Sequence, residues 1–91
     1  QQKSKMIWIH PLDVLGAEKP YILIVEPWAS QYEIHPKDQC VVLIKHSSQP
    51  ARIGVELNYG NVLTVWAQLS GSTYEFWRNG KQEDENSISV P

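Results

Sequence analysis

Apolar and polar residues alternate with a period of two along much of this chain, which is the pattern of β-strands with one buried face. Residues 53–57 alternate in this way and residues 62–69 do so again, with the turn-forming tripeptide Tyr59-Gly60-Asn61 between them. This part of the chain therefore predicts a β-hairpin. A second hairpin is predicted around Asn79-Gly80, the dipeptide best suited to a type I′ turn, between an alternating run at 73–78 and a return at 81–83.

Further strands are predicted in the first half of the chain. The apolar run Tyr21–Glu26 lies between two prolines, is too short for a buried helix and predicts a central strand. Residues 31–35 alternate, and Pro36-Lys37-Asp38 turns the chain toward the apolar run at 40–44, which predicts a third hairpin. A short first strand is expected at 6–9, followed by a loop at 10–19 that contains at most one helical turn, at 13–19.

These elements add up to seven or eight strands, with a turn signal about every 8 to 12 residues and no segment of helical period. We predict an all-β fold, namely an antiparallel β-sandwich, a jelly roll or a partly open barrel. Gly54 interrupts an alternating strand, which indicates a bulge or the close approach of another group. The predicted core consists of Ile22, Ile24, Val42, Ile44, Val55, Leu57, Leu63, Val65 and Phe76.

Length and composition place the chain among single-domain globular proteins. It has 91 residues, of which 42% are hydrophobic and 20% charged, and we expect one β domain over residues 1–91. Glu83, Asp84 and Glu85 indicate a polar, acidic tail from about residue 83, ahead of a short run at 87–90 that is able to pair as an edge strand.

Charge and cysteine content narrow the classes of partner and compartment. A net charge of −2 provides no electrostatic footprint for phosphate backbones or anionic lipid, so a nucleic-acid or membrane partner is not expected. No apolar run approaches the roughly 18 residues of a spanning helix. Cys40 is the single cysteine, which excludes an internal disulfide, and a lone reduced thiol favours a cytoplasmic location. No export signal is visible in the opening residues.

Cys40 and the histidines are the candidate metal ligands, because thiolate and imidazole are the groups that zinc and copper prefer. His35 lies across the predicted third hairpin from Cys40, and His10 is the remaining candidate. These three residues define an alternative hypothesis, a small metal-dependent enzyme or metal-binding protein. His46 would lie about 20 Å from Cys40 along one continuous strand, too far to share an ion with it. The main expectation is that the protein holds no metal or other cofactor, with a buried thiol and surface histidines in turns.

No motif for covalent or general acid–base catalysis stands out, and no catalytic residue is assigned. The chain lacks a Gly-x-Ser-x-Gly elbow and a glycine-rich phosphate loop. His46 is followed by two serines, a tripeptide expected to form a turn whose hydroxyls bond to their own backbone. Glu26 ends an apolar strand, so we expect it to be partly buried and to accept a structural hydrogen bond. The sequence favours a protein that is not an enzyme.

Aromatic residues are the most informative feature for function. Nine of them, including four tryptophans, are many for one small core, so some should be exposed. Trp66 alternates with core-facing residues and Trp77 points away from Phe76, which places both on outer faces. Paired across neighbouring strands and joined by Tyr59, they would form an apolar patch able to bind a sugar, a peptide or a second subunit. The alternative is a two-sided core in which one tryptophan closes the end of the fold.

The leading functional hypothesis is therefore a non-enzymatic binding or assembly module that uses Trp66, Trp77 and Tyr59. The expected partner is a second copy of the chain or another protein. Under this hypothesis the aromatic surplus forms the contact surface, because exposed apolar patches on small domains mark interaction sites.

Three features resemble a group of small bacterial all-β proteins of unassigned function. They are Glu26-Pro27-Trp28-Ala29 after an apolar strand, a Pro-x-Asp turn at 36–38, and a tryptophan-rich second half that ends at Asn79-Gly80. The resemblance covers about two-thirds of the chain and implies an all-β fold. It implies no activity, ligand or site residue.

Overall fold

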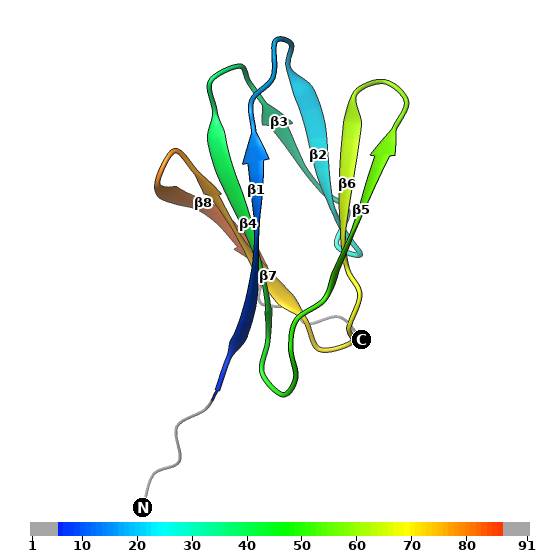
Figure 1. The fold of residues 1–91 in the computed structure, drawn as a ribbon, viewed down its shortest axis with the longest axis vertical. Helices are drawn as coiled ribbons and strands as arrows, with labels where there is room; N and C mark the ends of the chain where they lie inside the picture. The colour runs from blue at the N-terminus through cyan, green and yellow to red at the C-terminus, as the bar shows by residue number, and fades with distance from the viewer. Residues whose placement is uncertain (1–5, 87–91) are drawn as a thin grey trace, which may run out of the picture.

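The computed structural model describes residues 6–86, and within them the chain forms eight strands in two four-stranded sheets (Figure 1). The sheets pack face to face and are not closed into a barrel, so the predicted all-β fold is confirmed in its sandwich form. The strands are β1 (Trp8–Leu15), β2 (Tyr21–Glu26), β3 (Ser30–Ile34), β4 (Gln39–His46), β5 (Ile53–Asn58), β6 (Val62–Ala67), β7 (Thr73–Arg78) and β8 (Lys81–Asn86).

The chain passes back and forth between the two sheets. The first sheet has the order β1-β4-β7-β8, and the second has the order β3-β2-β6-β5. The described pairs are antiparallel except β2 with β6, which run parallel with Leu23 beside Leu63. The expectation of a purely antiparallel fold is wrong at this pair. Between β2 and β6 the chain crosses to the first sheet for β4 and returns, so β6 enters beside β2 in the same direction.

The predicted hairpin between residues 31 and 44 is also wrong, because β3 and β4 belong to different sheets. The turn at 36–38 instead carries the chain from one layer to the other. Asp38 Oδ2 accepts the His35 N–H at 2.9 Å and a hydrogen bond from Arg78 Nη1 of β7, which fixes the crossing. Alternation of apolar residues shows which side chains share a face, whereas the choice of sheet depends on contacts between distant strands.

The other two predicted hairpins, β5–β6 and β7–β8, are confirmed. Asn79 and Gly80 have φ of +51° and +82°, the left-handed conformation that a type I′ turn requires at both central positions. Gly54 pairs directly with Trp66 in a continuous register, so the strand has no bulge there. The expected close approach is present, because a β-carbon added at Gly54 would lie 2.7 Å from the Gln68 side-chain nitrogen.

Both ends of the described chain contain more strand than expected. β1 continues to Leu15, so the predicted loop at 10–19 and its helical turn at 13–19 are wrong. Pro11 is compatible with strand because β1 is an edge strand, where the missing N–H need not serve a neighbour. β8 extends to Asn86, so the acidic residues from 83 form an edge strand rather than a tail, because β7 provides their main-chain partners. The run at 87–90 lies outside the described residues.

The core lies between the two sheets. Of the predicted core residues, Val42, Ile44, Val65 and Phe76 are fully buried, and Leu63 packs against them. The assignment of β2 was inverted: Leu23 and Val25 are buried, while Ile22 and Ile24 are half-buried on the outer face. Both faces of this strand are apolar, so alternation does not distinguish them.

Val55 and Leu57 are exposed, at 54% and 79%, so their assignment to the core is wrong. They lie opposite Val65 and Leu63 in the β5–β6 register, and directly paired residues project from the same face of a sheet. Both therefore point toward the inner face of the second sheet. Their exposure means that the first sheet does not extend far enough to cover β5.

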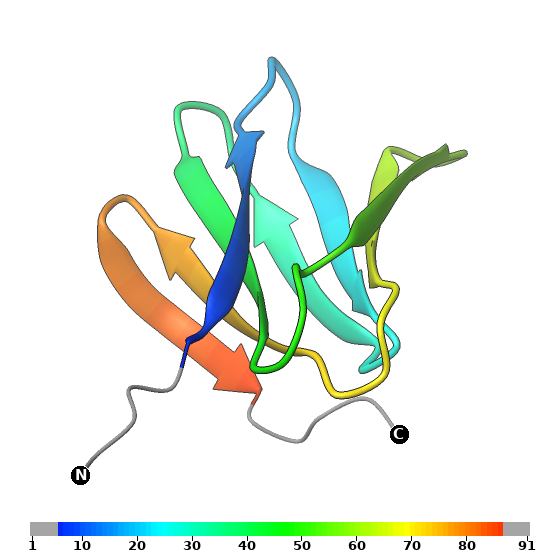
Figure 2. The same ribbon diagram turned by 60° about the horizontal axis from the view of Figure 1, so that its bottom comes forward.

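One side of the sandwich, where β3 packs on β7 and β8, is sealed by side chains and is named here the closed side. Tyr32 OH donates to Asp84 Oδ2 at 2.6 Å and accepts from Tyr74 OH at 2.7 Å. The Tyr32 ring also stacks on Phe76 with 4.0 Å between centroids. The opposite side, with edge strands β1 and β5, is named the open side; β8 and β5 lie at opposite ends of the molecule in Figure 2.

Candidate functional site

The three aromatic residues predicted to form a patch lie on separate surfaces. Trp66 projects outward from β6 and is 41% exposed, and Tyr59 is fully exposed in the β5–β6 turn. Trp77 is half-buried on β7 of the other sheet, where its Nε1 donates to Glu75 Oε1 at 2.8 Å. The outer faces of two packed sheets point in opposite directions, so the predicted pairing of Trp66 with Trp77 across neighbouring strands is wrong.

The candidate metal ligands are not brought together either, and residues 6–86 contain no group of three or more such side chains able to hold a metal ion. Cys40 is fully buried in the core, and burial raises the pKa of its thiol. His35 is exposed and contacts Glu33 Oε1 at 2.7 Å, whereas His10 lies on β1 opposite Ile44. The structure therefore contradicts a metal centre built from His10, His35 and Cys40.

His46 and Glu26 have structural roles. His46 is buried, not at the surface as expected, and its Nε2 lies 2.7 Å from the Ser70 carbonyl. Its Nδ1 accepts the N–H groups of Ser48 and Gln49 at 3.1 and 3.2 Å, so the imidazole rather than a serine hydroxyl organises this turn. Glu26 Oε1 accepts the Ala29 N–H at 2.9 Å, as predicted.

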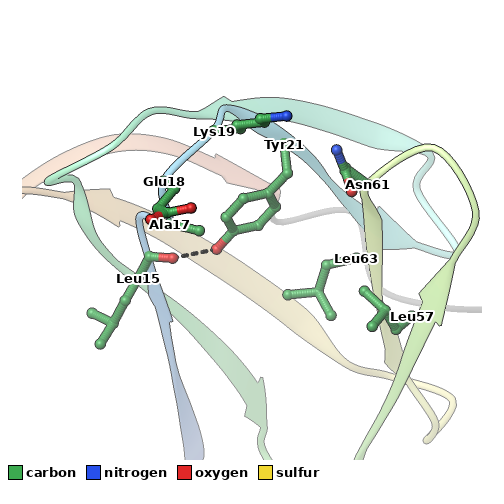
Figure 3. Close-up of a pocket in the computed structure, with 8 residues that line it drawn as sticks. All are labelled: Leu15, Ala17, Glu18, Lys19, Tyr21, Leu57, Asn61 and Leu63. Carbon is green, nitrogen blue, oxygen red and sulfur yellow. Dashed lines mark hydrogen bonds between the residues drawn. The ribbon is translucent and has the colours of Figure 1, made fainter.

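A cleft of about 590 Å³ opens between the β1–β2 loop and the β5–β6 hairpin (Figure 3). Its walls come from both sheets, and one of its residues spans them: Tyr21 OH, on β2, donates to the Leu15 carbonyl of β1 at 2.5 Å. Burial raises the pKa of this phenol, so it remains a donor at neutral pH. The lining residues are Leu15, Ala17, Glu18, Lys19, Tyr21, Leu57, Asn61 and Leu63.

The cleft combines an apolar floor with polar groups at its mouth. Leu57 exposes 79% of its surface beside it, and Leu63 lies next to Leu57 in Figure 3, so the two leucines form an apolar surface of the kind that takes part in contacts. Glu18 and Lys19 supply one charge of each sign, and Figure 3 shows Lys19 and Asn61 directed along the upper rim. Such a site favours an apolar side chain with polar atoms on either side of it.

The free edge of β5 lies next to this cleft and carries unpaired main-chain groups. The Gln68 N–H donates to the Arg52 carbonyl at 3.1 Å, and main-chain groups of an antiparallel strand point to one neighbour at every second residue. Since the main-chain groups of Arg52 point to β6, those of Ile53, Val55 and Leu57 point away from it. The free edge and the inner face of β5 therefore belong to the same three residues, of which Val55 and Leu57 are exposed and Ile53 is half-buried.

The β1 edge is blocked by two features. Its Gly16 N–H donates to the Asp38 carbonyl at 2.8 Å, and counting back from this bond places Pro11 among the residues that face the free edge. Pro11 has no N–H to offer there, and the Leu15 carbonyl is already bonded to Tyr21.

The edges on the closed side are also protected against pairing. The Arg78 guanidinium lies across β3, and its Nη1 donates to the Glu33 carbonyl at 2.9 Å. β8 consists entirely of polar and charged residues, and its register with β7 shifts at Phe76/Trp77. Charge, irregular register and side-chain cover are devices that prevent edge strands from pairing with other chains. Among the four described edges, β5 has regular register, no side chain across it and no proline or lysine, and its single charged residue, Glu56, projects from the outer face.

Comparisons with protein-family models, with curated proteins and with solved structures find no match to this chain. Among residues 6–86, no helix is long and apolar enough to cross a membrane.

Sequence reasoning missed the cleft and the β5 edge because Val55 and Leu57 fit a core pattern perfectly well. One signal was available in composition: Pro11 and the charged run at 83–85 lie in segments that the structure shows to be edge strands, whereas residues 53–58 contain neither proline nor lysine. β3 lacks both residues as well, so composition and sheet order leave two candidate edges, and the Arg78 side chain that crosses β3 leaves β5.

Proposed function

We propose that this protein is a non-enzymatic binding module that recognises an extended polypeptide strand along the free edge of β5. The observation that carries the proposal is the coincidence, at Val55 and Leu57, of outward-pointing main-chain groups with exposed apolar side chains, extended by the half-buried Ile53. Strand addition of this kind draws affinity from main-chain hydrogen bonds and specificity from pockets for alternate side chains.

The cleft supplies such a pocket. Leu57 belongs both to β5 and to the cleft wall, so a strand added to β5 would pass along the cleft and place a side chain against Leu57 and Leu63. Burying Leu57 and Val55 under a partner would remove apolar surface from water at about 25 cal/mol per Å². The polar rim would hold the strand's orientation without requiring a buried charge.

The test uses a synthetic octapeptide with valine at alternate positions and threonine between them, titrated into the isotopically labelled protein. We expect amide chemical-shift changes at Ile53, Val55 and Leu57 and at Leu63, with none at Phe76. The same peptide with a central proline serves as the control, because it lacks the donor that the edge needs, and it should bind at least about tenfold more weakly. Shifts confined to Trp77 and its neighbours, or no shifts at all, would contradict the proposal.

A matched pair of protein variants sharpens this test. Val55→Pro removes a free-edge N–H without touching the β5–β6 ladder, and it should abolish the shifts. Ile9→Pro removes the equivalent free-edge N–H on β1 and should leave peptide binding unchanged.

A further inference from the structure

We infer that the strand added to β5 is β5 of a second copy of this chain, antiparallel across a two-fold axis, with Val55 opposite Val55 of the second copy. The inference rests on the proposed function, because it names the partner for the same edge. Its result would be a continuous eight-stranded sheet, formed by joining the second sheets of the two copies at their β5 edges.

The main-chain groups match in this register. Ile53, Val55 and Leu57 each present an N–H and a C=O to the free edge. With Val55 on the axis, Ile53 of each copy lies opposite Leu57 of the other, so all three residues form hydrogen-bonded pairs. Every donor that β5 leaves free then meets an acceptor that the second copy leaves free.

The side chains of the inner face match as well. Val55 meets Val55, and Ile53 meets Leu57, so three apolar pairs form one stripe across the joint. This stripe lies beside the cleft of each copy, since Leu57 belongs to both. The interface is self-complementary, as a two-fold contact between identical surfaces must be.

The outer face adds charge complementarity. Glu56 lies opposite Gly54 of the second copy, which has no side chain, and diagonal to Arg52 beyond it, at the roughly 7–8 Å between diagonal neighbours that an arginine spans. Arg52 and Glu56 are both exposed. Symmetry produces this opposite-charge contact twice, against one like-charge diagonal between Glu56 and Glu56 of the second copy. A slip of two residues that paired Glu56 with Glu56 would bring like charges together, which favours the Val55 register over it.

No other described edge offers the same match. Pairing of β8 with β8 would align Glu83, Asp84 and Glu85 with acidic residues of the second copy. Pairing of β1 with β1 would meet a missing donor at Pro11, and β3 is crossed by Arg78.

The test is the mass of the intact protein in solution, measured by light scattering and sedimentation velocity from micromolar to hundreds of micromolar. We expect a concentration-dependent rise from 10.4 kDa toward twice that mass. Val55→Pro should lower the association constant at least about tenfold, whereas Ile9→Pro should leave it unchanged. A circular dichroism spectrum and melting temperature close to those of the parent protein show that each variant is folded.

A charge exchange tests the register without any change to the backbone. Arg52→Glu should lower the association constant by about threefold to tenfold, since two symmetric attractions become repulsions. Glu56→Arg should do the same, and the double variant should restore association to within about threefold of the parent value. Neither residue lies in the core, so unfolding does not confuse the result.

A mass of 10.4 kDa at every concentration would overturn the inference, as would a dimer unaffected by Val55→Pro or not restored by the double charge exchange. These results are separable from failure of the proposed function. A monomer that still binds the valine–threonine octapeptide at β5 retains the function and loses the self-pairing, whereas a monomer that does not bind it loses both.

Discussion

The two sides of this sandwich end in edge strands of similar length, yet only one side is sealed. On the closed side, Tyr32 reaches from β3 to Tyr74 and Asp84 in the other sheet, and Arg78 reaches back to the β3 main chain. On the open side, the two sheets are linked by the hydrogen bond from Tyr21 to the Leu15 carbonyl. β5 extends past it with Val55 and Leu57 exposed.

The difference separates a side whose edge strands are sealed by side chains from a side on which, in our proposal, β5 binds a further strand. On the closed side Tyr32 stacks on Phe76 and pairs its hydroxyl with Tyr74, and no buried side-chain nitrogen or oxygen of the described residues lacks a hydrogen-bond partner. Apolar side chains and main-chain donors on the open side are left to water. Edges of that kind are ordinarily protected, and the lack of protection at β5 is what supports the proposed contact there.

The largest contrast between the two sides should appear on truncation of an apolar side chain. Phe76→Ala should lower the free energy of unfolding by about 3–5 kcal/mol, because it opens a cavity under the Tyr32 ring. Leu57→Ala should change it by less than about 0.5 kcal/mol, since Leu57 is largely exposed. Urea denaturation at low micromolar protein measures both. A cost for Leu57→Ala near that of Phe76→Ala would show that the open side is in fact part of the core.

Removal of a phenol hydroxyl should give a smaller difference in the free energy of unfolding between the two sides. Tyr32→Phe leaves the buried Tyr74 hydroxyl without its acceptor and should cost about 1–3 kcal/mol. Tyr21→Phe leaves the Leu15 carbonyl accessible to water and should cost less than about 0.5 kcal/mol. Equal costs, measured by the same denaturation experiment, would remove the proposed distinction between the two links.

Acid should weaken the turn that connects the two layers next to the closed side. The pKa of the Asp38 carboxyl is lowered, first because the His35 N–H donates to it and then because Asn79 and Arg78 do so. A lowered pKa in the folded state contributes stability that is complete above the unfolded value, about 4, and lost as the pH falls through the folded value. The melting temperature should therefore decrease as the pH is lowered below about 4. This decrease should be smaller in Asp38→Asn.

Asp13→Asn provides the control for that experiment. Asp13 is exposed on β1 of the open side, so this variant should keep the acid dependence of the parent protein. If Asp13→Asn flattens the profile as much as Asp38→Asn does, the acid sensitivity does not come from the turn at 36–38.

The smallest effect is expected where the open side has room for an added atom. Gly54→Ala would meet only the end of the Gln68 side chain, which is free to move, so the free energy of unfolding should change by less than about 0.5 kcal/mol. Gly71→Ala is the control, because Gly71 has φ of +89° and a β-carbon added there would lie 3.2 Å from His46 Nε2. It should destabilise by about 1 kcal/mol or more. A larger cost at Gly54 than at Gly71 would reverse this assignment.

Local pattern was sufficient for the elements themselves. Alternation and turn chemistry predicted the strands at β5, β6 and β7, the left-handed turn at Asn79-Gly80, and burial of Val65 and Phe76, because each depends on residues close in sequence. The same pattern failed where the conformation or burial of a segment depends on a strand that is distant in sequence. β8 is a strand despite its acidic composition because β7 pairs with it, and Ile22 faces outward because both faces of β2 are apolar.

The candidate site depended wholly on contacts between residues that are distant in sequence. Trp66, Trp77 and Tyr59 were reasonable from their positions along strands, and the sheet order then placed Trp66 and Trp77 on opposite outer faces. The sequence by itself determined that this is an all-β chain of seven or eight strands with more apolar side chains than one core requires; the choice of a sandwich over a barrel came from the structure. Only the tertiary structure decided that β3 and β4 separate, and that β5 extends beyond the cover of the first sheet. A period of two specifies which residues share a face, but whether that face is buried depends on what the rest of the chain packs against it.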